Sequence, residues 1–403
     1  MIRLKDTHHA STADFLSEAI RTAEYYGFAP LEEMRMTRMA KSGEKDDKKR
    51  AAKSDSDIAY ARRDERPLTS SAKRCAACAR TQKEGFLAWR TVQNTTGIPS
   101  TTLELHVVGS TSAVSEALLL VVAHAILEEA GIGEKYLAIN NIGSHESSNR
   151  FVRDVSAYLR KHIETISPTL RPRAATDPLG TLVQLIERGH PAAPRAPQAM
   201  EYLTEEERRK FWELLEYLEV YGLPYELSPQ VLGSRDCWAH SLFEISTVDE
   251  ESGSRVAIAF GGRYDPLATR FGSEATPAAM ISINCEVRGK TQVKREKRGV
   301  PAIYFAHLGA EARRRALSVL ETLRHADIPV HQSLLYDRIG EQMVQAKQLA
   351  VPYILIMGYK EAMENTVLVR EVVSNSQEAV PLDDLSNYLR RRRISAPLAA
   401  LSA

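Results

Sequence analysis

The fold is decided by the stretch VAIAFGGRYDPLATRFG, residues 256–272. Its apolar first part predicts a buried strand that ends at Gly261 and Gly262. Two glycines at a strand end allow a ligand or another backbone to come close, and they can equally make a tight bend. Three polar residues follow the glycines: Arg263, Tyr264 and Asp265. The residues alone therefore leave both a binding site and a purely structural bend open.

The chain has 403 residues, of which 43% are hydrophobic, which is enough for two or three domains with sizeable cores. Its formal net charge is +1, so any contact with nucleic acid must come from local patches and not from a global field. The longest apolar run in a helical region, residues 117–127, is too short to span a bilayer, and the N-terminus has no signal-peptide pattern. Four cysteines do not make a disulfide framework in such a chain. We therefore expect a cytoplasmic protein with no membrane segment.

The segment GGRYDPL resembles the GGRYDGL segment of class II histidyl-tRNA synthetases, and neighbouring segments agree with that family in the same order. The resemblance covers residues 10–33 and 86–391 and is closest at 261–267 and 338–358. It implies an α+β fold, in which an antiparallel class II synthetase-type sheet with helices is followed by a C-terminal α/β anticodon-binding-type domain. It also implies a homodimer.

The resemblance divides the chain into a catalytic-type domain, residues 1–298, and an anticodon-binding-type domain, residues 299–403. A helical insertion is expected at about 165–222, where Thr204 and Glu207 predict a capping box. The second domain alternates apolar and amphipathic segments in the order βαβαββα, which predicts an α/β unit with a parallel core. In the family this domain reads bases splayed from the anticodon loop, so tRNA or another structured RNA is the expected partner.

A charged segment at residues 35–65 interrupts the resemblance. It is dense in Lys, Arg, Asp and Ser with little to bury, which predicts a solvated, mobile segment. Its basic clusters are also compatible with an arm that contacts RNA phosphates, although the interleaved acids weaken the field.

Cys75 and Cys78 form one CxxC, which can be half of a zinc site or a redox pair. No second CxxC or HxxxH lies nearby in the sequence. On a helix both thiols would lie on one side as small core residues. We therefore predict core residues here and no metal site.

Residues 86–109 predict two strands around a turn, and in the family this is the second class II motif. The resemblance places Arg90 on the arginine that holds the ATP α-phosphate and the amino-acid carboxylate. It places Thr102 and His106 on the glutamine and glutamate that recognise the substrate histidine. An ordinary strand residue is the alternative reading of His106.

The segment VLGSRDCWAHSLFEI, residues 231–245, corresponds to the family's LVRGLDYYTGTVFEF. In this correspondence Gly233 occupies the position of the family's catalytic arginine. Trp238 occupies the position of one of the two tyrosines around the bound histidine. Arg235 would point to the same side of a strand as Gly233, displaced by ~6.6 Å. Because catalytic positioning tolerates about 1 Å, Arg235 is a doubtful substitute. The glutamate of the family's RPE-x-T stretch is likewise replaced, by Leu68.

Residues 276–290 match the third class II motif and keep its glutamate as Glu286. The arginine that would clamp the ATP γ-phosphate is Val287, and Arg288 is its neighbour. If this stretch is helical, a shift by one residue turns a side chain by about 100° away from the required direction.

Two functions follow from these replacements. Loss of one transition-state donor costs roughly 10²- to 10³-fold in rate, so several losses predict a tRNA-binding or regulatory protein with a degenerate site. The alternative is an active histidine–tRNA ligase that uses ATP and Mg²⁺ with relocated arginines. A regulatory subunit of histidine biosynthesis is disfavoured, because that type usually lacks the C-terminal domain. The predicted site residues are Arg90, Arg235, Trp238, Tyr264, Thr102, His106, Gly261, Gly262, Glu286 and Arg288.

Overall fold

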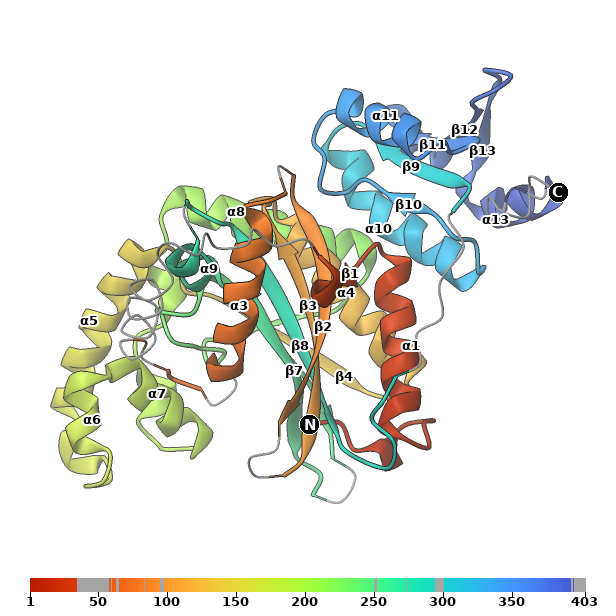
Figure 1. The fold of residues 1–403 in the computed structure, drawn as a ribbon. Coiled ribbons are helices and arrows are strands. Elements are labelled where there is room, and N and C mark those ends of the chain that lie inside the picture. Colours follow the sequence, from red (N-terminus) through yellow and green to blue (C-terminus); the bar gives the residue numbers. More distant parts are fainter. Residues whose placement is uncertain are drawn as a thin grey trace, which may run out of the picture.

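The computed structural model describes residues 1–34, 58, 60–62, 65–82, 84–94, 98–249, 252–272, 274–293, 301–392 and 394. Most of the charged segment 35–65 lies outside the described residues, and so do the two interpretations of that segment. Figure 1 shows two sheets, each with its own helices, in the N-terminal and C-terminal parts of the chain.

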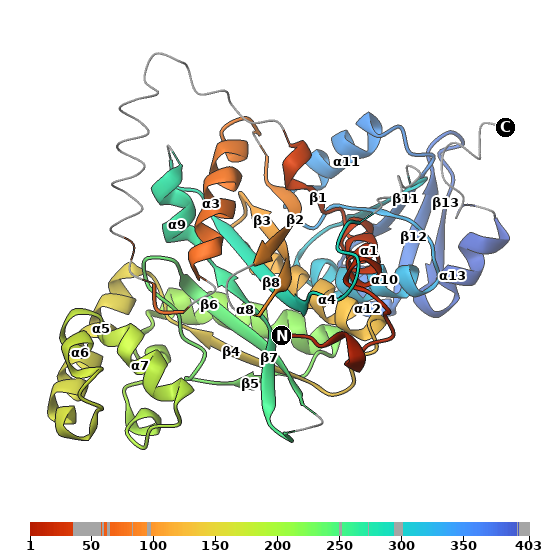
Figure 2. The same cartoon turned by 60° about the horizontal axis from the view of Figure 1, so that its bottom comes forward.

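The first sheet has, among the described residues, eight strands in the order β1-β2-β3-β8-β7-β6-β4-β5 (Figure 2). The outermost pairs, β1 with β2 and β4 with β5, are parallel, and the pairs between them are antiparallel. This is the antiparallel synthetase-type sheet that the resemblance implied. The strands are β1 (Ala29–Pro30), β2 (Phe86–Asn94), β3 (Ser100–Val108), β4 (Lys135–Asn141), β5 (Glu226–Leu227), β6 (Ala239–Val248), β7 (Arg255–Arg263) and β8 (Ala278–Glu286).

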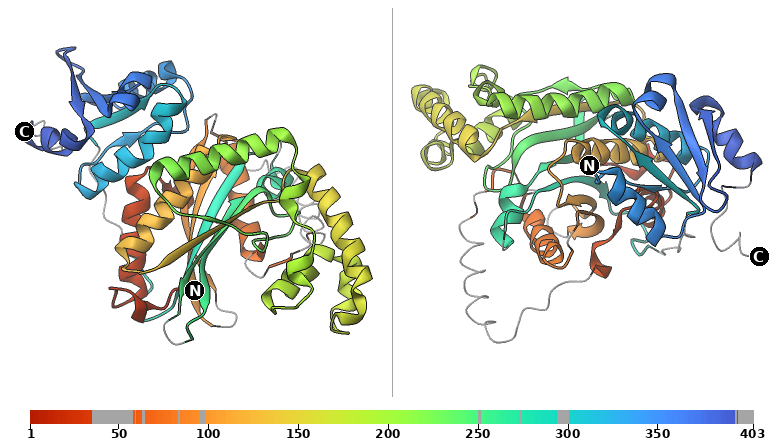
Figure 3. Two further views of the ribbon diagram at one scale, coloured as in Figure 1. Left: turned by 180° about the vertical axis from the view of Figure 1, so that it is seen from behind. Right: turned by 90° about the horizontal axis from the view of Figure 1, so that it is seen from above.

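Helices cover both faces of this sheet because its central strands are buried on both sides. On β3, Leu103 and Leu105 belong to the core beneath α1 (Thr12–Tyr25) and α4 (Val114–Glu129). The opposite face lies beneath α3 (Glu65–Ala79) and α9 (Asp265–Phe271), as Figure 2 shows. The long helix α8 (Glu205–Tyr221) packs against α4 at the back (Figure 3).

Residues 165–222, where the helical insertion is expected, contain α6 (Arg171–Thr176), α7 (Pro178–Glu187) and α8 (Glu205–Tyr221). The helix α5 (His145–Lys161) precedes them and packs against α6 and α7 at the left of Figure 1. Short 3₁₀ turns are η1 (Leu4–Asp6), η2 (Leu31–Glu33), η3 (Ile163–Thr165), η4 (Ala193–Arg195) and η5 (Ala199–Tyr202).

The predicted capping box at the start of α8 is confirmed, and it also ties α8 to α5. The Glu207 carboxylate accepts the amides of Thr204 (2.7 Å) and Ser144 (2.6 Å) and the hydroxyl of Ser147 (2.8 Å). Burial alone would raise the pKa of Glu207, but these hydrogen bonds lower it to about 2. The ionised carboxylate therefore holds the start of two helices.

Replacing Glu207 by glutamine is expected to cost about 2 kcal/mol of stability at pH 7, because an amide has one oxygen to accept these donors. A carboxyl whose folded pKa lies below its unfolded value stabilises above the unfolded pKa, near 4.5, and loses that contribution as the pH falls toward 2. The difference between wild type and variant should therefore shrink between pH 5 and pH 2 in urea unfolding. Glu205→Gln, at an exposed position of the same turn, is the control. A stability difference between wild type and Glu207→Gln that stays constant with pH would contradict the role of the ionised Glu207 carboxylate.

The second sheet has, within residues 301–392, five strands in the order β10-β9-β11-β12-β13. Strands β10, β9 and β11 are parallel, which confirms the predicted parallel core, and β12 and β13 extend it antiparallel. Two short elements were absent from the predicted order, α12 and β13, because a six-residue helix and a mostly exposed strand carry little periodic signal. The elements are β9 (Ile303–His307), α10 (Ala310–His325), β10 (His331–Gln332), α11 (Ile339–Gln348), β11 (Tyr353–Met357), α12 (Tyr359–Glu364), β12 (Thr366–Glu371), β13 (Gln377–Pro381) and α13 (Leu382–Arg391).

The two parts of the chain share a continuous hydrophobic core where α1 and α4 meet α10. The Tyr25 hydroxyl donates to the carbonyl of Ile328 at 2.9 Å, and Tyr26 is hydrogen-bonded to Glu321. Arg324 on α10 also pairs with Glu129 at the end of α4. Among the described residues, no helix has both the length and the apolar character that crossing a membrane requires.

Candidate functional site

The candidate site is the face of the first sheet that lies beneath α3. Opposite partners in register place Arg90, Glu104 and Ser282 in one row across β2, β3 and β8. The neighbouring row contains His106 and Gly262. The registers thus bring together Arg90, His106 and Gly262, which are three of the predicted site residues.

Arg90 is held by neighbouring side chains. Its guanidinium donates to the hydroxyls of Ser70 (3.2 Å) and Ser71 (3.0 Å) on α3, and it pairs with Glu32 at 3.1 Å. Ser71 also bonds to the Glu104 carboxylate. The residue predicted to hold a phosphate is therefore attached to α3 and to η2.

His106 is fully buried between a phenol and a carboxylate. Its Nδ1 lies 3.1 Å from the Tyr264 hydroxyl, and its Nε2 lies 3.3 Å from Glu104. Desolvation opposes protonation, but the Cys75 thiol and Glu104 beside the ring raise the pKa of His106 above its ordinary value. The structure therefore places the His106 imidazole of the protein itself against Tyr264, another of the predicted site residues.

Cys75 and Cys78 are buried residues of α3, in the core cluster beneath that helix, as predicted. Burial and the neighbouring Cys75 raise the pKa of Cys78 to about 11, so this thiol is protonated near neutral pH.

The position of the family's catalytic arginine is closed. A side chain at Gly233 would meet the Trp238 ring at 2.5 Å and the Glu65 carboxylate at 3.0 Å. Glu65 is fully buried and accepts the Trp238 indole (3.1 Å) and the Ser234 amide (2.6 Å). Glu65 lies three residues before Leu68, on the same side of α3. It was not among the predicted site residues.

The glycine pair is explained by neighbouring strands. A Cβ at Gly261 would lie 2.2 Å from the carbonyl oxygen of Met280, and one at Gly262 would lie 2.4 Å from that of Ser241. Both glycines lie inside β7, which pairs with β6 and β8, and not at a free strand end. Close approach of backbone is therefore sufficient reason for glycine here.

Of the other two predicted arginines, Arg235 is half-buried and Arg288 is exposed. Arg235 is hydrogen-bonded to Asn149 on α5. Arg288 is exposed, and its backbone amide is hydrogen-bonded to the Thr12 hydroxyl at 2.7 Å. Residues 287 and 288 follow strand β8 and are not helical, so the expected 100° rotation was the wrong geometry for this stretch.

Glu286 and Thr102 complete the predicted set. The Glu286 carboxylate accepts the backbone amide of Leu4 at 2.7 Å, and Thr102 donates to Asn284 at 2.6 Å. The Arg90 and Glu286 side chains are thus bound by other groups of the protein, and Arg288 is exposed.

One cation on this face was not predicted. Arg62 lies over the Phe260 ring, 3.8 Å from its centroid, and pairs with Glu244 at 3.2 Å. Phe260 and Glu244 continue the row of Arg90 and Glu104 across β7 and β6. Residue 62 belongs to the charged segment, where the sequence offered no periodic pattern to place it.

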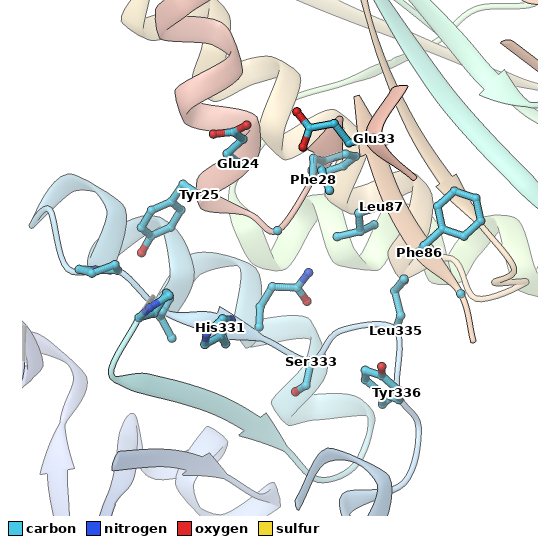
Figure 4. Close-up of a pocket in the computed structure, with 17 residues that line it drawn as sticks. Glu24, Tyr25, Phe28, Glu33, Phe86, Leu87, His331, Ser333, Leu335 and Tyr336 are labelled. Carbon is cyan, nitrogen blue, oxygen red and sulfur yellow. The ribbon is translucent and has the colours of Figure 1, made fainter. Parts of the chain in front are cut away.

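A separate cavity of about 660 Å³ lies between the first part of the chain and the C-terminal domain (Figure 4). Glu24 and Phe86 line one side, and His331, Ser333 and Tyr336 line the other. Burial lowers the pKa of His331, so this imidazole is neutral near pH 7. None of the predicted site residues lines this cavity.

Comparisons with known proteins show what this chain is similar to. A family model described as an anticodon binding domain matches residues 302–392. The histidine–tRNA ligase of Cyanothece sp. (strain PCC 7425 / ATCC 29141) is 29% identical over 297 residues, which cover 72% of this chain and 68% of that protein. The histidine–tRNA ligase of Bacillus subtilis (strain 168) is 27% identical over 291 residues, which cover 71% and 68%.

Among solved structures, the histidyl-tRNA synthetase from Nostoc sp. PCC 7120 covers 96% of this chain and 98% of its own, at 15% identity and a TM-score of 0.41. The relatives, the matched C-terminal domain and the order of the sequence segments agree with one another. These similarities support a member of the class II histidyl-tRNA synthetase family.

Proposed function

We propose that this protein binds tRNA, or another structured RNA, and does not charge it with histidine. The observation that carries the proposal is the filled pocket. His106 lies against Tyr264 and Glu104, and Glu65 with Trp238 occupies the space around Gly233. A histidine substrate would have to displace buried, hydrogen-bonded groups of the protein.

The missing arginines also argue against charging of tRNA. Adenylate formation needs cations arranged around the phosphates and the attacked carboxylate. Of the three family arginines, Arg90 remains, and its guanidinium is bound to Glu32 and two serines. Each lost transition-state donor costs roughly 10²- to 10³-fold, so the combined loss leaves too little rate for charging tRNA.

The RNA part of the proposal rests on the C-terminal domain and on the relatives. The anticodon binding domain model matches nearly all of that domain, and the relatives are named as tRNA ligases. In this fold class such a domain contacts unstacked bases. A homodimer and a cytoplasmic location remain predictions.

An active histidine–tRNA ligase is the second candidate, favoured by the names of the relatives. It would require ATP, Mg²⁺ and a convergence of Arg90, Arg235 and Arg288. Arg235 would first have to leave Asn149, and Arg90 would have to leave Glu32.

Pyrophosphate exchange dependent on histidine and ATP separates the two candidates. We expect the purified full chain to give background exchange while it retards a histidine-specific tRNA transcript in a gel shift. The histidine–tRNA ligase of Bacillus subtilis serves as the positive control for exchange. Exchange that rises with histidine and disappears in Arg90→Ala would establish the active enzyme instead.

A further inference from the structure

We infer that the junction of α4 and α10 is a zinc site, whose ligands are two imidazoles and two carboxylates. The ligands are His124 and Glu128 on α4, and Glu321 and His325 on α10. Zinc bound here would join the first part of the chain to the C-terminal domain. The inference goes beyond the proposed function and does not depend on it.

The two helices each supply one pair of ligands. His124 and Glu128 are spaced i, i+4, and so are Glu321 and His325, so the members of each pair lie on one side of their helix. The helices pack on each other within one hydrophobic core. One ligand atom from each of Glu128, Glu321 and His325 lies within 4.8 Å of the other two. Side chains on facing helices are a common source of metal ligands in helical proteins.

The distances between these atoms fit the coordination of zinc. Tetrahedral zinc binds imidazole nitrogen and carboxylate oxygen at ~2.0–2.2 Å, which spaces neighbouring ligand atoms by roughly 3.3–3.5 Å. Nε2 of His325 lies 3.0 Å from Oε1 of Glu321, and Nδ1 of His124 lies 3.8 Å from Oε2 of Glu128. The side chains of His325 and Glu128 are 57% and 53% exposed, so both can rotate to close on the metal.

The imidazole of His124 gives an independent reason for a cation at this junction. Its Nδ1 atom is buried and has no hydrogen-bond partner among the described residues. The 3.8 Å to Glu128 is too long for a hydrogen bond. Burial and the Lys135 charge lower the pKa of His124, which favours the neutral form with the lone pair that a metal needs. A bound metal would satisfy this nitrogen.

The charges of the junction also allow a cation. Among the described residues, Glu128 forms no ion pair with a lysine or an arginine. Arg324 pairs with Glu129 and Glu321, and the ammonium of Lys135 donates to two backbone carbonyls. Three carboxylates therefore meet with two cations. Since each carboxylate oxygen accepts more than one contact, Glu321 can bind a metal while it keeps Arg324.

The ligand types favour zinc over calcium or magnesium. Calcium and magnesium take oxygen ligands, and magnesium keeps several of its waters. Imidazole nitrogen is a ligand for zinc and its neighbours in the transition series. Two histidines in the set therefore select a transition metal.

The test is a calorimetric titration of the metal-free, full-length protein with Zn²⁺ at neutral pH. We expect one zinc per chain. We expect His325→Ala and Glu128→Gln each to weaken binding at least about tenfold, because loss of even an outer-shell partner of a metal costs roughly 10- to 100-fold. Both positions are exposed, so the fold should persist, and a thermal melt checks this. Titration with Mg²⁺ should give no comparable binding.

The matched control is His145→Ala, which removes an exposed imidazole from the start of α5 and should leave zinc binding unchanged. Absorption spectroscopy at the zinc edge should detect two imidazole ligands in wild type and one in His325→Ala. Hydrogen exchange at the ends of α4 and α10 should slow when zinc is added to wild type, and not in His325→Ala.

Three results would overturn the inference. Wild type that binds no zinc has no such site. Equal affinities of wild type, His325→Ala and Glu128→Gln would mean an adventitious ion only, bound elsewhere. Zinc bound through oxygen ligands alone would exclude the two histidines. Each of these results would leave the proposed RNA binding as it stands, because that proposal uses none of the four ligands.

Discussion

Replacing Glu65 by alanine is expected to lower the free energy of unfolding by about 3–5 kcal/mol. The carboxylate is fully buried and accepts the amides of Ala61 (2.6 Å), Arg62 (3.0 Å) and Ser234 (2.6 Å) and the indole of Trp238 (3.1 Å). Alanine leaves these donors without their acceptor, and each buried donor left unsatisfied costs about 1–3 kcal/mol. Urea unfolding followed by circular dichroism measures the change.

Two variants make this result specific. Glu65→Gln keeps one acceptor oxygen and turns an amide donor toward existing donors. Its free energy of unfolding should therefore lie between those of wild type and Glu65→Ala. Glu146→Ala removes an exposed carboxylate from the first turn of α5 and should change stability far less. Equal effects of Glu65→Ala and Glu146→Ala would mean that the Glu65 carboxylate does not hold the closed site together.

Local patterns predict the elements that depend on near neighbours. The capping box at Thr204 and Glu207 and the helical core position of Cys75 need information from one turn of chain, and both are confirmed. The class II sheet and the C-terminal domain came from segments matched to a family, because strand order depends on contacts that no local pattern contains.

The closed site could not be predicted in the same way. Glu65 meets Ser234 across 169 residues, and the sequence gives no register for that contact. Leu68 stands where the family has a glutamate, but one turn earlier on α3 the buried Glu65 carboxylate accepts the Trp238 indole. His106 was left open between a ligand and a strand residue, and its enclosure by Tyr264 depends on pairing through β8.

Replacing Arg263 by methionine is expected to destabilise the protein by about 3–5 kcal/mol, because it leaves the buried Glu116 carboxylate without its cation. The guanidinium pairs with Glu116 (2.9 Å) and Asp265 (3.2 Å) and donates to the carbonyl of Ser110 (2.7 Å). Its side chain and that of Glu116 are 5% and 7% exposed. Arg255→Met is the matched control, because the same strand pairs Arg255 with Glu226 at the same 2.9 Å but at 48% and 51% exposure. Losing that exposed ion pair should lower the stability by at most about 1 kcal/mol.

The pH dependence identifies the cause of the Arg263 effect. Burial already raises the pKa of Glu116, and the nearby Arg263 charge opposes that rise, so its removal should raise the pKa of Glu116 further. A carboxyl whose folded pKa exceeds its unfolded value stabilises at low pH and loses that contribution as the pH rises through the folded pKa. The deficit of Arg263→Met should therefore be smaller at pH 5 than at pH 8, whereas that of Arg255→Met should change little. A large deficit that is the same at both pH values would instead point to lost packing at the end of β7, since a methionine cannot replace the hydrogen bond to Ser110 at any pH.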